Sequence, residues 1–368
     1  TMGGANVWAG MAVDEERGLV YCPTGSATFD YYGGDRIGQN LFANTLLCLN
    51  ARTGERVWHY QIIHHDLHDY DLPSPPNLLT VKRNGEEIPA VSQLTKQGYL
   101  FVFNRVTGEP IFPIEERTIP KSEMPGEESW PTQPRPTKPA PYIREYFTED
   151  EINDISPETH QQILAKYSTM LPHVPFQPPS LKQDTIVHPG MVGGAEWGGG
   201  ATDPNGILYF NANQSSAILT MIDLSEGSSR GELLYKINCM ACHGPDFKGG
   251  TAFGQVIPSL EGISDRKDSS DIRRSIINGG TTMPPFRHLA GQDIFHIMNY
   301  MGVLGQDDER EEATQAYEGP KVRFIHTGNN IWHDSNGYPA VKPPWGTLNA
   351  IDLNTGEYLW SKTFGEYE

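Results

Sequence analysis

The chain has 368 residues, of which 37% are hydrophobic and 10% aromatic, enough to bury a sizeable core in more than one domain. Its formal net charge of -18 argues against nucleic acid or an anionic membrane as partner, because both require a basic surface, and favours a cationic protein. No apolar run approaches the roughly 18 residues that a transmembrane helix needs. The opening TMGGANVWAG has no signal-peptide pattern and is typical of a domain interior, so we expect a partial or processed chain.

The first expected elements are short strands that recur along the chain in two patterns. WAGMAVDEERGLVYCPTG from Trp8 and WGGGATDPNGILYFNANQ from Trp197 share an aromatic-Gly start, an Asp-containing turn and a strand. The second pattern is Asn or Asp, then Thr-Gly-Glu and an aromatic; it follows the runs TLLCL, YLFVF and TLNAI and ends at Trp58, Phe112 and Trp360. Thr-Gly predicts a tight turn and the aromatic predicts docking between neighbouring sheets, which is typical of β-propeller blades.

Residues 64–71 read HHDLHDYD, with three histidines and three aspartates. A metal site, a proton-transfer site and polar residues in a turn are all compatible with this composition. The cluster alone leaves these alternatives open.

Residues 110–190 contain about half of the 29 prolines, which predicts a long irregular excursion with one short helix near residues 148–167. Long loops in compact domains are usually functional coverings. We therefore expect this segment to cover a site.

Cys239, Cys242 and His243 form CMACHG, the Cys-x-x-Cys-His attachment pattern of c-type haem. Two thiols on one turn add to the haem vinyl groups, which holds the adjacent histidine as an iron ligand. The alternatives are a redox Cys-x-x-Cys or half of a zinc site, but no second Cys/His pair follows at zinc-finger spacing. The pattern favours covalent haem c, and because this attachment occurs outside the bacterial cytoplasm, we expect a periplasmic or secreted protein.

Helical segments surround the attachment pattern: GELLYKIN precedes it, and SSDIRRSIINGG and GQDIFHIMNYM follow it. Between the last two, GGTTMPPF presents Met283 on a proline-braced loop as the sixth iron ligand, with His288 as the competing ligand. Residues 227–305 thus resemble a complete α-helical class I cytochrome c domain. We expect it to be inserted between propeller blades formed by residues 1–226 and 306–368.

Four longer motifs carry a family resemblance: VWAGMAVDEERGLVY, HHDLHDYDLPSPP, LTKQGYLFVFNRVTGEP and KPPWGTLNAIDLNTGEYLW. With the repeats, they resemble the pyrroloquinoline quinone (PQQ) dependent alcohol and sugar dehydrogenases, especially the quinoprotein glucose dehydrogenase branch. The resemblance implies a mainly β fold, an eight-bladed propeller with PQQ and a divalent cation, commonly calcium, near its axis. This chain carries only about four blades' worth of repeats, so we expect a partial propeller.

The resemblance assigns roles within HHDLHDYD. Asp69 matches the family's catalytic base, although His68 stands where an aromatic residue is usual. Hydride transfer from an alcohol to a quinone carbonyl needs a carboxylate to accept the hydroxyl proton and a cation to polarise the carbonyl. Asp71 would share a face with Asp69 in a strand and is a further cation ligand. An acid here accompanies lanthanide use in some methanol dehydrogenases but also occurs in the glucose branch, so it does not decide the metal. His64 and His68 are interpreted as hydrogen-bonded wall residues.

Other roles follow from further family motifs. Lys96 in LTKQG matches the lysine that reaches the quinone oxygens, where an ammonium stabilises the negative charge of the reduced cofactor. Trp8 matches the tryptophan that forms the floor under the PQQ ring. Ser26 stands where the family often has a metal-ligating asparagine, so we expect Asp69 and Asp71 to carry more of the coordination. Three weaker candidates for the cofactor pocket are Asn213, Trp197 and Trp345.

Two further cysteines, Cys22 and Cys48, lie in strand-like runs of one blade. A disulfide is one alternative, and two buried free thiols are the favoured one.

Two functions are compatible with these motifs. The first is a quinohaemoprotein dehydrogenase that oxidises an alcohol or aldose hydroxyl at PQQ and passes electrons through haem c to an external acceptor such as a soluble cytochrome. The second is a non-catalytic electron-transfer protein on a propeller scaffold. A base, a quinone-binding lysine and a stacking tryptophan occurring together favour the enzyme.

Overall fold

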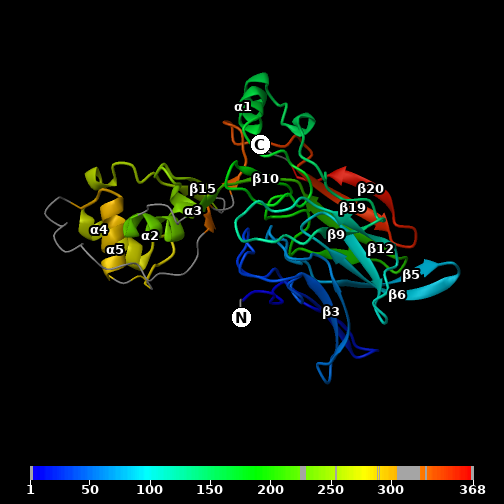
Figure 1. The fold of residues 1–368 in the computed structure, drawn as a ribbon. Coiled ribbons are helices and arrows are strands. Elements are labelled where there is room, and N and C mark those ends of the chain that lie inside the picture. The colour runs from blue at the N-terminus through cyan, green and yellow to red at the C-terminus, as the bar shows by residue number, and fades with distance from the viewer. Residues whose placement is uncertain are drawn as a thin grey trace. The chain divides into compact units, whose positions relative to one another are not determined.

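The computed structural model describes residues 3–223, 229–252, 255–287, 289, 291–304, 324–327 and 330–365. It divides the chain into two compact units, which we call the sheet unit (residues 1–218 and 331–368) and the helical unit (residues 219–330) (Figure 1). The predicted domain boundaries, at 226/227 and 305/306, lie outside the described residues. No helix among the described residues is long and apolar enough to cross a membrane.

Two antiparallel sheets make up the N-terminal part of the sheet unit (Figure 1). The first contains β1 (Ala12–Asp14), β2 (Leu19–Pro23), β3 (Thr45–Asn50) and β4 (Arg56–Gln61), in that order. The second contains β5 (Asn77–Arg83), β6 (Glu86–Leu94) and β7 (Leu100–Asn104). Each sheet is a meander of sequence neighbours, as expected for blades.

A third antiparallel sheet is assembled from two distant parts of the chain. Its order is β11 (Gly200–Thr202), β12 (Ile207–Asn213), β19 (Gly346–Asp352) and β20 (Glu357–Thr363). Strand β12 pairs with β19 over seven residues, from Ile207 opposite Asp352 to Asn213 opposite Gly346. The expectation that the helical segment lies between two blades was therefore wrong: it interrupts one sheet, between its second and third strands.

The Thr-Gly-Glu repeats form the same turn three times. The side chain of the first residue, Asn50, Asn104 or Asp352, accepts a 2.9 Å hydrogen bond from the backbone N–H two residues on. Such Asx turns are a local device that depends only on residues close in sequence. This is why the repeat could be read directly from the chain.

The aromatic that ends each of the first two repeats packs against the next sheet. Trp58 lies 6.0 Å from the Phe103 ring, and its Nε1 donates to the Arg105 carbonyl at 3.0 Å. A Cβ at Gly108 would lie only 2.8 Å from the Trp58 ring, and a Cβ at Gly356 equally close to Phe112. The turn glycine thus supplies both the positive φ and the space for the preceding aromatic, which confirms the predicted docking of Trp58 and Phe112. The third aromatic, Trp360, does not dock between sheets: it is 37% exposed and its ring lies 6.1 Å from Tyr209 of its own sheet.

The proline-rich segment is more regular than expected. It contains the hairpin β8 (Ile114–Thr118) and β9 (Thr132–Pro136), the 3-10 turn η1 (Glu149–Glu151), helix α1 (Pro157–Tyr167) and strand β10 (Thr185–Val187). Strand β10 forms a small sheet with β13 (Ala217–Leu219) and β18 (Asn330–Ile331). Helix α1 is the predicted helix, and Ser156 caps it by accepting from the Thr159 N–H.

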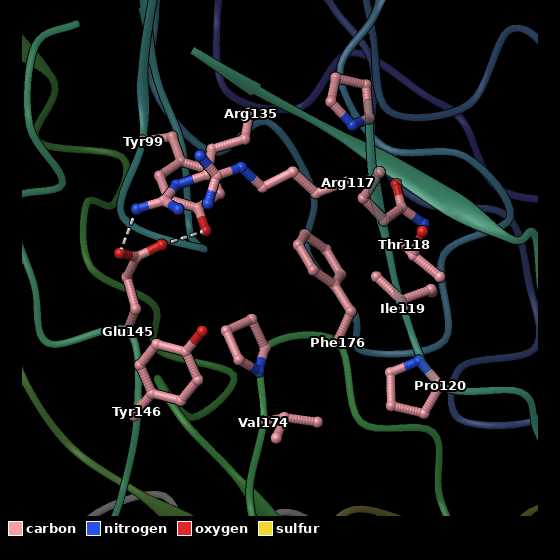
Figure 2. A pocket seen from close by; sticks show the side chains of 13 residues that line it. Tyr99, Arg117, Thr118, Ile119, Pro120, Arg135, Glu145, Tyr146, Val174 and Phe176 are labelled. Carbon is pink, nitrogen blue, oxygen red and sulfur yellow. Dashed lines mark hydrogen bonds and ion pairs between the residues drawn. The ribbon is translucent and has the colours of Figure 1, made fainter. Parts of the chain in front are cut away.

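The hairpin β8–β9 and the chain around Phe176 line a cavity of about 450 Å³ that is partly open to solvent (Figure 2). Beneath the segment, Phe147 and Ile163 pack with Trp332 in a buried apolar cluster. The segment is therefore anchored to the sheet unit by its own core.

The helical unit contains four helices, two two-stranded antiparallel sheets and one 3-10 turn among its described residues. They are α2 (Arg230–Asn238), α3 (Met240–His243), α4 (Ser269–Asn278), α5 (Gly291–Tyr300), β14 (Met221–Asp223) with β17 (Phe324–His326), β15 (Gly250–Ala252) with β16 (Gln255–Ile257), and η2 (Ile263–Asp265). Side-chain oxygens of Ser229 and Asp268 cap α2 and α4. Helices α2, α4 and α5 match the three predicted helical segments.

Candidate active site and haem pocket

The HHDLHDYD segment is a buried loop that follows β4, and it is not the strand considered above. Asp66 organises it: Oδ1 accepts from the His68 N–H at 2.8 Å, and Oδ2 accepts from the Tyr70 N–H at 2.7 Å and from Asn44 at 3.0 Å. Asp69 adopts a φ of +56°. This left-handed turn, rather than strand alternation, sets the direction of the Asp69 side chain.

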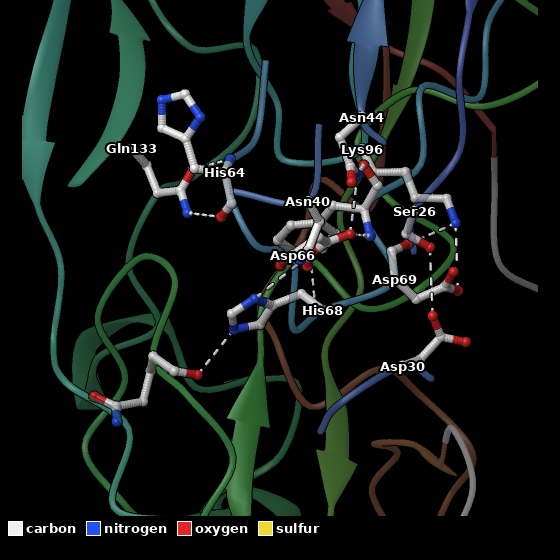
Figure 3. A network of polar contacts seen from close by, with 12 residues as sticks. Ser26, Asp30, Asn40, Asn44, His64, Asp66, His68, Asp69, Lys96 and Gln133 are labelled. Carbon is white, nitrogen blue, oxygen red and sulfur yellow. Dashed lines mark hydrogen bonds and ion pairs between the residues drawn. The ribbon is translucent and has the colours of Figure 1, made fainter. Parts of the chain in front are cut away.

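Lys96 meets this loop (Figure 3). Its Nζ donates to the Asp69 carbonyl at 2.8 Å and lies 3.2 Å from Asp71 Oδ2 and 3.5 Å from Asp69 Oδ2. The Lys96 side chain is only 5% exposed. A solvated turn lysine is therefore excluded, and the structure brings together three of the residues that the sequence analysis singled out.

Ser26 lies on the other side of Asp71. Its backbone N–H donates to Asp71 Oδ1 at 2.6 Å, and its hydroxyl donates to Asp30 Oδ1 at 3.3 Å (Figure 3). The motif Thr24-Gly25-Ser26 follows β2 directly, so a strand end positions it. Asp30 was missed by sequence reasoning, because nothing in the surrounding ATFDYY marks that carboxylate.

Four buried or half-buried carboxyl groups surround the single ammonium of Lys96; they belong to Asp30, Asp69, Asp71 and Glu196. Burial raises the pKa of Asp69 to about 9, with Asp30 and Asp71 adding to the rise and Lys96 opposing it. Burial also raises the pKa of Asp30 to about 6 and that of Glu196 to about 7. For Asp71, burial opposes ionisation, but the Lys96 ammonium and hydrogen bonds outweigh it and lower the pKa. An additional cation would relieve this repulsion.

Hydrogen bonds and ring contacts hold His64 and His68 in the loop. His64 Nδ1 lies 2.9 Å from Gln61 Oε1, and His68 Nε2 lies 2.9 Å from the Gln177 carbonyl. His68 stacks on Tyr70, with ring centroids 5.2 Å apart. These contacts are those expected of hydrogen-bonded wall residues.

The structure gives less direct support for the other residues that the sequence analysis assigned to the cofactor pocket. Trp8 is 44% and Trp197 74% exposed. The Asn213 N–H donates to the Gly194 carbonyl at 2.7 Å, and the Gly194 N–H donates to the Lys96 carbonyl at 2.6 Å, so Asn213 reaches Lys96 only through backbone. Trp345 is half-buried and donates from Nε1 to the Val341 carbonyl at 2.6 Å.

The helical unit has a cavity of about 410 Å³ lined by Cys239, His243 and Met283. Its other walls are largely apolar and include Ile272, Ile276, Ile297 and Met301. His243 Nδ1 lies 3.3 Å from the Pro258 carbonyl, which orients the ring and leaves Nε2 for another partner. Cys242 is half-buried beside Cys239. The competing ligand His288 lies outside the described residues.

The two other cysteines are both buried and free. Cys22 lies opposite Leu47 and Cys48 opposite Tyr21, so the two thiols point to opposite faces of one sheet. The favoured alternative of two free thiols is confirmed.

The chain is similar to known proteins of two families. Residues 1–244 and 282–368 match the PQQ family described as glucose/ethanol/alcohol dehydrogenase, β-propeller domain, and residues 227–301 match the family described as cytochrome c oxidase, cbb3-type, subunit III. The glycerol dehydrogenase large subunit of Gluconobacter thailandicus is 33% identical over 370 residues, which cover 98% of this chain and 48% of that protein. The quinoprotein glucose dehydrogenase of Escherichia coli is 36% identical over 214 residues, 56% of this chain and 26% of that protein.

A crystal structure of the quinohemoprotein alcohol dehydrogenase from Comamonas testosteroni aligns with 98% of this chain and 35% of its own, at 16% identity and a TM-score of 0.46. The family match covers most of the chain, and the chain belongs to the PQQ-dependent dehydrogenase β-propeller family. It spans between 26% and 48% of the length of the two curated relatives described above.

The residues present fit the groups that the family uses. Lys96 offers a buried ammonium to an anionic quinone. The apolar cavity with Cys239, His243 and Met283 fits a haem. Among the described residues, no three His, Cys, Asp or Glu side chains already stand in metal-binding geometry.

Proposed function

We propose that this chain is part of a quinohaemoprotein dehydrogenase that oxidises an alcohol or aldose hydroxyl and delivers the electrons through covalent haem c to an external acceptor. The observation that carries the proposal is the buried ammonium of Lys96, held between Asp69 and Asp71 in a chain that also contains a haem-sized apolar cavity. A non-catalytic propeller scaffold does not require a buried ammonium between two carboxylates.

PQQ, when bound, supplies the acceptor for the hydride of the substrate carbon. The protein's part is to move the proton. A cation held by Asp69 and Asp71 would favour the ionised form of Asp69, whose pKa burial otherwise raises to about 9, and the Asp69 carboxylate then accepts the hydroxyl proton of the substrate. Lys96 fixes the Asp69 backbone through the 2.8 Å bond to its carbonyl and places a positive charge where negative charge develops. Asp69 and Lys96 are therefore the proposed catalytic pair.

The cofactors are assigned to residues as follows. Lys96, Trp8 and Asn213 would hold PQQ, and Ser26, Asp69 and Asp71 would hold calcium or another cation. The excess of carboxylates around one ammonium supports a cation at this place. Asp30 and Glu196, which both interact electrostatically with Lys96, would add to the negative charge around that cation.

The haem would be held by thioether bonds to Cys239 and Cys242, with His243 and Met283 as iron ligands. The 3.3 Å contact from His243 Nδ1 to the Pro258 carbonyl and the position of both ligands on the cavity wall support this assignment. Haem attachment implies a periplasmic or secreted location. The net charge of -18 suits a soluble, basic acceptor such as a cytochrome.

The substitution Asp69→Asn in the full-length protein tests the proposal. An amide cannot accept the hydroxyl proton, so turnover with an alcohol or aldose should fall by roughly 10²- to 10⁴-fold while PQQ stays bound. The exposed Asp154, changed to Asn, is the matched control and should leave turnover unchanged. Near-normal turnover in an Asp69→Asn protein that holds its cofactor would exclude Asp69 as the base.

A further inference from the structure

The cavity under hairpin β8–β9 belongs to neither of the proposed cofactor sites (Figure 2). Its polar end carries Arg117, Arg135, Glu145 and the Tyr99 hydroxyl. Its other walls are mainly apolar and include Ile119, Pro120, Val174, Pro175 and Phe176, with Thr118 and Gln133 as further polar members. A ligand that fills it must therefore be charged or strongly polar at one end and apolar at the other.

The polar end has more donors than acceptors. Both Glu145 oxygens are engaged, Oε1 by the Tyr99 hydroxyl at 2.7 Å and Oε2 by Arg135. Arg117 Nη2 lies 3.0 Å from Oε2 of Glu115, which is half exposed and is not part of the cavity wall. Within the described part of the chain, Nε and Nη1 of both arginines bond to no other protein group. Two guanidinium groups thus retain free N–H donors.

We propose that this cavity binds a small monocarboxylate that carries a ring or a compact hydrocarbon body. The carboxylate would pair with the guanidinium groups, whose planar fork matches two oxygens. The apolar body would lie against Phe176, Pro120 and Val174. The cavity volume of about 450 Å³ lies within the usual range of small-molecule sites. A neutral polyol has no apolar group to pack against the apolar walls, and an inorganic anion would leave these walls in contact with water.

A single aromatic side chain, Phe176, connects this cavity with the candidate catalytic loop. Phe176, which forms part of the cavity wall, also packs edge-on against His68 at 5.9 Å and Tyr70 at 6.0 Å, the neighbours of Asp69. Binding in the cavity needs no PQQ, cation or haem. The inference therefore stands or falls independently of the proposed function.

Benzoate is the probe, and isothermal titration calorimetry on the chain with both units is the measurement. Benzoate should bind saturably with one site per chain. Benzyl alcohol, which keeps the ring without the charge, and acetate, which keeps the charge without the ring, should each bind at least about 10-fold more weakly, since a charge-assisted pair and a buried ring each contribute at this level.

The substitution Arg117→Gln should weaken benzoate binding by about 10-fold or more, and Arg117→Lys should weaken it less because the charge remains. Arg117 is 54% exposed, so neither change should prevent folding. Lys182→Gln is the matched control: Lys182 is also exposed and pairs with Glu123, but lies outside the cavity wall, and its loss should leave binding unchanged. Equal binding of benzoate and benzyl alcohol, wild-type affinity in Arg117→Gln, or no saturable binding at millimolar benzoate would each overturn the proposal.

Discussion

Acid should destabilise the sheet unit through two buried histidines of the proline-rich segment. His173 and His188 are both buried, with their rings 5.8 Å apart at right angles. Burial lowers the pKa of His173 to about 3, with His188 adding to the effect, and burial lowers the pKa of His188 to about 4. Both rings are therefore neutral in the folded protein, and the Phe147 N–H donates to His173 Nδ1 at 3.0 Å.

The magnitude follows from proton linkage. In the unfolded chain a histidine has a pKa of about 6.5. Below that pH the unfolded state therefore binds protons that the folded state does not bind. The stabilisation is complete above pH 6.5 and is lost as the pH falls toward the folded values. Between pH 7 and pH 5 each histidine should lower the free energy of unfolding by about 2 kcal/mol, and the pair by about 4 kcal/mol.

The assay is urea unfolding at pH 7 and pH 5, followed by tryptophan fluorescence, because all seven tryptophans lie in the sheet unit. In His173→Asn, the amide oxygen can still accept from Phe147, and one titrating group is gone. The loss of stability on acidification should shrink by about 2 kcal/mol relative to wild type. Met170→Leu, a buried and non-titrating change in the same cluster, is the control and should keep the wild-type pH dependence. An unchanged pH dependence in His173→Asn would refute the reasoning.

Three further outcomes are expected of the full-length protein. Met283→Ala should abolish the methionine-iron charge-transfer absorbance while the haem stays attached, and retention of the band would give the ligand role to another residue. Lys96→Met should weaken PQQ binding by about 10- to 100-fold in a cofactor titration, because the buried ammonium is lost; wild-type affinity would exclude contact with the quinone. Reoxidation of the haem by a cationic cytochrome should slow as salt rises, since screening weakens attraction to the acidic surface, whereas a salt-independent rate would argue against electrostatic guidance.

Local sequence signals predicted the local structure well. The Thr-Gly-Glu turns depend on one Asx side chain and one glycine, and the helices of the helical unit depend on caps such as Ser229 and Asp268. What the sequence did not reveal was the pairing of β12 with β19 across the helical unit. That pairing is a contact between residues more than a hundred positions apart, and no local pattern carries it.

The same contrast between local signals and long-range contacts applies to the candidate site. Asp69, Asp71 and Lys96 were found because they stand in long motifs, and the structure brings them together. Asp30 and Glu196 escaped notice because single acids in irregular segments resemble surface residues, and only the fold reveals their burial. Strand alternation does not place Asp69 and Asp71 on one face, because the Asp66 carboxylate accepts hydrogen bonds from the backbone of His68 and Tyr70 and holds the segment as a loop.

Stopped-flow measurement of substrate-driven haem reduction in the full-length protein, loaded with PQQ and calcium, tests the central claim most directly. If oxidation and haem reduction occur within one molecule, the rate of reduction should be independent of enzyme concentration and nearly insensitive to salt, since a tethered partner replaces a bimolecular encounter. A rate that scales with enzyme concentration, or no substrate-dependent reduction of a haem that dithionite reduces readily, would contradict the account and favour an electron-transfer protein on a propeller scaffold.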